Sequence, residues 1–168
     1  MCGIVAWLSN ERLDINELTS MTNVIAHRGP DDVGYLLSNS FIGGNAESLR
    51  KVSTLESDVN FGFSHRRLSI VDLSSQGHQP MPFKGCYWLT YNGEIYNYIE
   101  LRKDLEEIGY IFETETDSEV ILASYDAWGV GCLDKFNGMW AFVLYDKNKQ
   151  QFFVSRDRFG IKPLYYYQ

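Results

Sequence analysis

The second residue of this 168-residue chain is a cysteine, and its position gives it two groups that can work in catalysis. Once the initiator Met1 is removed, Cys2 carries both a thiol and a free α-amine. A thiolate is a good nucleophile, and an α-amine with a reference pKa of about 7.7 to 8.0 can accept the thiol proton near neutral pH. Removal of Met1 is favoured because Cys2 and Gly3 are both small. A buried strand residue or a frayed terminus is the usual alternative for a cysteine in this position that stands alone.

The other cysteines and the histidines do not suggest a metal site. The three cysteines and three histidines lack the short spacings typical of zinc ligands, so no metal is expected. An odd number of cysteines indicates a reducing compartment. The apolar run Ile4–Leu8 is too short for a membrane span and no basic segment precedes it, which predicts neither a signal peptide nor an anchor. We therefore expect a cytoplasmic protein.

The charge of the chain excludes some classes of partner. Its 22 acidic and 15 basic residues give a formal net charge of -7. This is the wrong sign for neutralising phosphates, so neither nucleic acid nor an anionic membrane is an expected partner. With 45% hydrophobic residues and no repeat or linker, the sequence indicates one globular domain.

Strands and helices are expected in groups along the chain. A strand at the start is followed by a helix that Asp14 caps, with apolar residues at helical spacing. Two later amphipathic helices are predicted: Asn97 caps the first and Gly109 stops it, and Asp117 or Ser118 opens the second and Gly129 stops it. Leu101, Leu105 and Ile108 are predicted on the inner face of the first of them. Short strands are expected at 34–37, 61–64, 87–91, 139–145, 152–155 and 164–167. This grouping favours an α+β fold with antiparallel sheets.

Eight sequence blocks occur in a fixed order that matches a known family. They are MCGIV at the start, HRGPDD (27–32), SHRRLSIVDLS (64–74), QP (79–80), YNGEIYNY (91–98), TDSEV (116–120), FNGMWAF (136–142) and RDRFGIKPLYY (156–166). Together they resemble the glutaminase domain of glutamine-dependent asparagine synthetases, a branch of the class II glutamine amidotransferases. The resemblance covers essentially the whole chain.

The resemblance implies a fold and a reaction. The fold is that of the N-terminal-nucleophile hydrolases, a four-layer αββα sandwich of two antiparallel sheets. The reaction is hydrolysis of the side-chain amide of L-glutamine to glutamate and ammonia, with Cys2 attacking the amide carbon and its amine moving the proton. Water would then release the thioester.

The resemblance also implies roles for further residues. Asn92 and the backbone N–H of Gly93 would stabilise the oxyanion of the tetrahedral intermediate, although Asn-Gly alone is also a common tight turn. Arg67 would hold the substrate carboxylate and Asp117 its ammonium, since these groups are complementary in charge. As alternatives, Arg67 is a surface arginine next to Arg66 and Asp117 is a helix cap. The remaining predicted contacts to glutamine are Glu94 and the main chain of Leu68, Ser69, Ile70 and Val71.

Asparagine synthetases continue into a domain that uses ATP, and nothing like its phosphate loop occurs in these residues. We therefore expect one glutaminase domain over residues 1–168, truncated at its C-terminus, with the synthetase domain absent. No cofactor is expected in this chain, and ATP and Mg²⁺ are expected only in that absent domain. That synthetase domain is the expected partner in a full-length protein and would consume the ammonia. The acceptor of the ammonia stays open, as does a homodimer.

Two other hypotheses stay open beside the glutaminase. One is a catalytically idle module of the same fold that binds glutamine and regulates or assembles with a partner. The other is an N-terminal-nucleophile hydrolase that acts on a different amide, for which Arg67 would be dispensable.

Overall fold

The computed structural model describes residues 2–9, 11–38, 47–49, 59–68 and 77–168. The described strands form two antiparallel sheets. The first has the order β1 (Gly3–Leu8), β4 (Phe61–Arg67), β2 (Asp32–Ser38) and β3 (Glu47–Leu49), and the second has the order β5 (Met81–Phe83), β6 (Tyr87–Ile95), β7 (Gly138–Asp146) and β8 (Gln151–Arg156).

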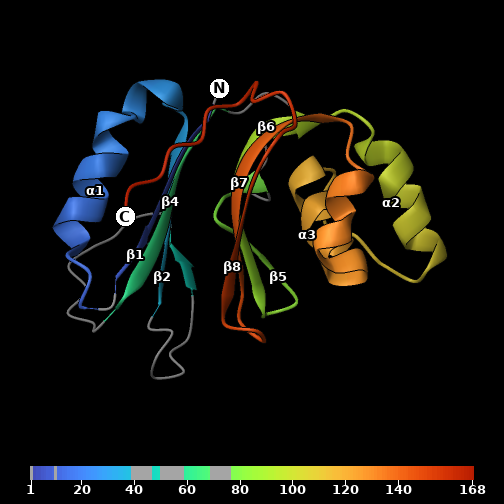
Figure 1. Cartoon of the computed structure of the whole chain (residues 1–168), viewed down its shortest axis with the longest axis horizontal. Coiled ribbons are helices and arrows are strands. Elements are labelled where there is room, and N and C mark those ends of the chain that lie inside the picture. Colours follow the sequence, from blue (N-terminus) through green and yellow to red (C-terminus); the bar gives the residue numbers. More distant parts are fainter. Residues whose placement is uncertain (1, 10, 39–46, 50–58, 69–76) are drawn as a thin grey trace.

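The two sheets lie face to face between layers of helices (Figure 1). Helix α1 (Ile15–Val24), followed by the short 3-10 turn η1 (Ala26–Arg28), covers the outer face of the first sheet. Helices α2 (Tyr98–Glu107) and α3 (Asp117–Trp128) lie outside the second sheet, and the 3-10 segment η3 (Gly129–Asp134) leads from α3 to β7. The predicted α+β architecture of four layers is confirmed.

Apolar side chains fill the space between all of these layers. Between the sheets, the buried residues are Leu36, Phe61, Phe63, Trp88, Val143 and Tyr145. Under α1 they are Leu13, Leu18, Tyr35, Leu37 and Val59. Because alternate residues of a strand face opposite sides, β2 supplies Leu36 to one layer and its neighbours Tyr35 and Leu37 to the other.

The helix starts differ in part from prediction. The Asp14 side chain accepts a hydrogen bond from the Asn16 N–H (2.8 Å), so the predicted cap of α1 is confirmed. The cap of α3 is Thr116, whose side chain accepts from the Glu119 N–H, and Asp117 is the first helical residue. The predicted opening of this helix at Asp117 is therefore confirmed, whereas the alternative of Asp117 as the helix cap is wrong by one position.

Helix α2 also departs from prediction, in its cap and in one residue of its predicted inner face. Asn97 precedes it but makes no side-chain cap, because its amide bonds the Lys135 carbonyl (3.0 Å) and the Asn137 N–H (2.9 Å). Leu101 and Leu105 are buried as predicted, whereas Ile108 at the end of the helix is 59% exposed.

Two strand predictions need correction. Asn92 and Gly93 do not form a tight turn, because β6 runs through them and pairs with Ala141 and Trp140 of β7. The segment 164–167 is not a strand in the structure, and its tyrosines 165 to 167 are almost fully exposed. Among the described residues, no helix has the length and apolar character needed to cross a membrane.

Candidate active site

Cys2 lies directly before β1, beside the end of β4. Its Sγ atom accepts a hydrogen bond from the Leu68 N–H (3.4 Å) and lies 3.8 Å from the Leu68 carbonyl oxygen. The Cys2 carbonyl accepts a bond from Arg28 Nε (3.4 Å). The half-buried thiol therefore lies against the main chain of a predicted substrate-binding residue. Met1 lies outside the described residues.

The turn after α1 packs against the strand that runs alongside Cys2. A Cβ at Gly29 would overlap the Arg66 carbonyl group and lie 2.6 Å from the Arg67 carbonyl carbon. Only glycine allows so close an approach. The HRGP segment thus has a local structural role, because it brings Arg28 to Cys2 and packs against the end of β4.

Arg66 and Arg67 point to opposite sides of the first sheet. Arg66 Nε donates to the Thr22 carbonyl of α1 (3.1 Å), so Arg66 faces the outer layer. Alternation along β4 places Arg67 on the same face as His65, and His65 Nδ1 lies 3.3 Å from Thr90 Oγ1 of β6. The half-buried Arg67 therefore faces the space between the sheets, which argues against the alternative of a surface arginine.

The predicted oxyanion residues lie on β6, within the second sheet. Asn92 is buried and Gly93 is half-buried, and Glu94 next to them is exposed. Figure 1 shows the start of β1 and the end of β6 at the same end of the two sheets. Residues of β1 and β6 also lie close to one another across the space between the two sheets.

Asp117 is held by two hydrogen bonds from β6. Its Oδ2 atom accepts from the Tyr91 hydroxyl (2.8 Å) and from the Ile95 N–H (3.0 Å). Burial raises the pKa of the Asp117 carboxyl, and the charge of Glu94 adds to the rise, while these two hydrogen bonds oppose it. The first turn of α3 therefore delivers this carboxylate to the strand that carries Asn92 and Gly93.

The loop before α3 is fixed by a buried carboxylate. Glu119 accepts hydrogen bonds from the N–H groups of Glu113 (2.9 Å) and Thr114 (2.7 Å) and from Thr114 Oγ1 (2.7 Å). Thr116 caps the same turn. Because these bonds are made within the protein, the position of Asp117 is set before any ligand arrives.

Two residues near Asp117 were not singled out by the sequence analysis. These two residues are Tyr91 and Gln79. Gln79 is buried and bridges β6 and α3, because its Oε1 accepts from the Tyr91 N–H (2.8 Å) and its Nε2 donates to Ser118 Oγ (3.1 Å). Both residues lie in blocks quoted above, QP and YNGEIYNY, so the blocks were the available signal. Of the predicted residues, Ser69, Ile70 and Val71 lie outside the described part of the chain.

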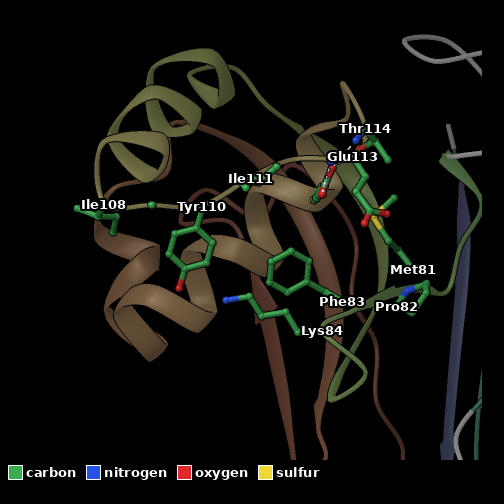
Figure 2. A pocket seen from close by; sticks show the side chains of 11 residues that line it. Met81, Pro82, Phe83, Lys84, Ile108, Tyr110, Ile111, Glu113 and Thr114 are labelled. Atoms are coloured by element: carbon green, nitrogen blue, oxygen red, sulfur yellow. Dashed lines mark hydrogen bonds between the residues drawn. The ribbon is translucent and has the colours of Figure 1, made fainter.

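A separate pocket of about 650 Å³ lies on the helical side of the second sheet (Figure 2). Residues of β5 and of the connection between α2 and α3 line it, including Phe83, Tyr110 and Glu113. The Lys84 side chain forms part of its wall, and Nζ lies 4.3 Å from the centre of the Tyr110 ring and 2.6 Å from Asp126 Oδ2. None of its lining residues is a predicted site residue, so the pocket and the Cys2 region are distinct places. In the part of the chain that the structure describes, no group of three potential ligands gathers to hold a metal ion.

Comparison with known proteins gives the class. A family model described as "Glutamine amidotransferase domain" matches residues 1–48 and 51–168, and the chain belongs to this family. A phosphoribosylpyrophosphate amidotransferase from Bacillus subtilis has a similar solved structure, with a TM-score of 0.76 at 20% identity over 97% of this chain and 38% of that one. The likeness shows the fold, which is the predicted N-terminal-nucleophile hydrolase fold.

The more similar relatives indicate the branch of the family. Asparagine synthetase (glutamine-hydrolyzing) 1 of Bacillus subtilis is 41% identical, and asparagine synthetase (glutamine-hydrolyzing) 3 of the same organism is 37% identical, each over 99% of this chain. The chain spans only 24% and 25% of the length of these two relatives. The resemblance to the glutaminase domain of asparagine synthetases is thus confirmed.

Proposed function

We propose that this chain hydrolyses L-glutamine through a thioester on Cys2. The observation that carries the proposal is the placement of the Cys2 thiol against the Leu68 main chain, at the end of the strand that contributes Arg67. The family membership supplies the class of substrate.

The proposed reaction begins with removal of Met1. The α-amine of Cys2 accepts the thiol proton, and Sγ forms a bond to the amide carbon of glutamine. The negative charge on the amide oxygen is stabilised by the Asn92 side-chain amide and the Gly93 N–H. The amine then passes the proton to the nitrogen as the carbon–nitrogen bond breaks and ammonia leaves. Water attacks the thioester, which releases glutamate and restores the thiol.

Charged groups at two positions fit a free amino acid. In the proposal Arg67 pairs with the α-carboxylate and Asp117 with the α-ammonium, while Glu94 and the main chain from Leu68 to 71 line the site. A guanidinium binds a carboxylate through two parallel hydrogen bonds, which selects for geometry as well as charge. The site would therefore prefer free glutamine to glutamine within a peptide.

We further propose that the ammonia serves an amidating domain of the asparagine synthetase type. The length of the relatives supports this, because they are about four times as long as the matched segment. That domain would hold ATP and Mg²⁺, and the glutaminase site needs neither for the steps above.

Glutamate release by untagged protein tests the proposed function. Cys2→Ala is expected to abolish release, and so is an N-terminal tag that is not cleaved, because it blocks the α-amine. Cys86→Ala is the matched control, since Cys86 is also half-buried but lies in the connection between β5 and β6. Undiminished release by Cys2→Ala would refute the mechanism. Binding of glutamine without release by the processed protein would favour the idle module instead.

A further inference from the structure

Tyr91 connects the proposed oxyanion strand to the proposed ammonium site. It directly precedes Asn92 on β6, and its side chain is buried. Its hydroxyl donates to Asp117 Oδ2 (2.8 Å), the same oxygen that accepts the Ile95 N–H (3.0 Å). Both of these bonds end on one oxygen, so they fix the rotation of the carboxylate about its side chain.

Both ends of this connection are anchored in the protein. Gln79 accepts a hydrogen bond from the Tyr91 N–H (2.8 Å) and donates one to Ser118 Oγ (3.1 Å), next to Asp117. Gln79 and Ser118 are buried, so water does not compete strongly for these bonds. The strand β6 and the first turn of α3 are thus tied together on either side of the carboxylate.

The Tyr91 hydroxyl stays a donor over the whole physiological range. Burial raises its pKa well above the usual value, and the negative charges of Asp117 and Glu94 act in the same direction. A protonated phenol can only point its hydrogen at the acceptor beside it, which here is the Asp117 carboxylate.

We propose that Tyr91 is a positioning residue for recognition of the substrate α-ammonium group: its hydroxyl holds Asp117 Oδ2, so that Oδ1 is presented to the ammonium. The inference deepens the proposed function, because it rests on Asp117 as the ammonium partner. Without the hydroxyl, the carboxylate keeps its charge and the bond from the Ile95 N–H but loses one of the two bonds that fix its rotation. Tyr91 should therefore contribute to the choice of an α-amino acid over an amide that lacks the amine.

Binding of two ligands tests the inference without any turnover. Calorimetry on a Cys2→Ala protein compares L-glutamine with glutaramate, which has the same amide and carboxylate but no amine. The ratio of the Kd for glutaramate to the Kd for L-glutamine measures recognition of the ammonium. Adding Tyr91→Phe should lower this ratio about tenfold, the range expected for a hydrogen bond to a charged group, and leave the Kd for glutaramate nearly unchanged.

Tyr125→Phe is the matched control. The Tyr125 hydroxyl lies on a later turn of α3 than Asp117. It also donates to a buried carboxylate, that of Asp146 at the end of β7 (3.2 Å). This variant should leave the ratio unchanged. If Tyr91→Phe does not fold, Tyr91→Met removes the same hydroxyl and should lower the ratio similarly.

Two results would overturn the inference. One is an unchanged ratio with Tyr91→Phe, which includes an equal loss of affinity for both ligands, and the other is a Cys2→Ala protein that does not distinguish the ligands. Failure of the proposed function looks different. In that case the protein with Cys2 intact releases no glutamate, yet binding still selects L-glutamine and Tyr91→Phe still removes the selection.

Discussion

The strands β6 and β7 leave no room for a side chain at Gly93. A Cβ at this position would overlap the Met139 carbonyl oxygen and lie 2.8 Å from Trp140 Cα, both backbone atoms of β7. Carbon atoms in ordinary contact are about 3.5 to 4.0 Å apart, so one strand must move by about 1 Å. Gly93→Ala therefore displaces the N–H that we assign to the oxyanion.

The size of the effect follows from this displacement. A shift of 1 Å in a reacting group can cost about 100-fold in rate, and loss of one oxyanion donor costs about 100-fold to 1000-fold. We expect kcat for glutamine hydrolysis to fall at least 100-fold in Gly93→Ala. Overpacking should also lower the free energy of unfolding by about 1 to 3 kcal/mol.

Glutamate release and urea unfolding measure the two effects on the same protein. Gly62→Ala is the control for instability, because a Cβ there would lie 2.6 Å from Leu18 Cδ2 under α1, in the layer outside the first sheet. It should lose stability but keep kcat. A folded Gly93→Ala protein with kcat within threefold of the unsubstituted protein would refute the assignment of this N–H.

Three further predictions concern charge and capping. Burial, with smaller contributions from His78 and Arg67, lowers the pKa of His65 to about 3, below the value of about 6.5 in an unfolded chain. Between these values only the unfolded chain binds the proton, so acidification from pH 7.5 to 5.5 should cost about 1.4 kcal/mol of stability through this group. Urea titrations of the His65→Asn protein should therefore show a smaller loss of stability between pH 7.5 and 5.5. The same loss as in the unsubstituted protein would contradict the reasoning. Thr116→Ala removes the α3 cap and should lower the free energy of unfolding by about 1 kcal/mol in the same titrations. An unchanged urea midpoint would argue against the cap. Asp117→Asn should raise KM for glutamine at least tenfold with a smaller change in kcat, because the ammonium loses its opposite charge. Steady-state kinetics check this, and a loss confined to kcat would exclude the assigned role.

The sequence predicted the elements whose signals are local. Asp14 and the apolar spacing after it identify α1, and its bounds need only neighbouring residues. Glycines 109 and 129 mark the ends of α2 and α3 for the same reason, since both have positive φ. The predicted strand segments located the long strands, but not the three-residue strands β3 and β5, which are too short to show a pattern.

Predictions failed where distant residues decide the conformation. Asn92 and Gly93 read locally as a turn, but pairing with β7, almost fifty residues later, keeps them extended. Asn97 reads as a cap, but its amide is used by Lys135 and Asn137. At the start of α3, Thr116 is followed by two other residues that also make good caps, so composition alone could not choose among the three.

The candidate site shows the same division. Cys2 stood out by its place in the chain, and the family resemblance singled out Arg67 and Asp117 by their blocks. The bridging role of Gln79 depends on contacts with β6 and α3 at once, which no local pattern contains.

The central claim is that Cys2 is the mature N-terminal residue and the nucleophile toward glutamine. Its most direct test is the mass of the intact, untagged protein after reaction with a glutamine analogue that carries a diazoketone in place of the amide. We predict a chain that lacks Met1 and bears a single adduct, located on Cys2 by peptide mapping and prevented by excess L-glutamine. A processed chain without an adduct, or an adduct on Cys86 or Cys132 instead, would contradict the account.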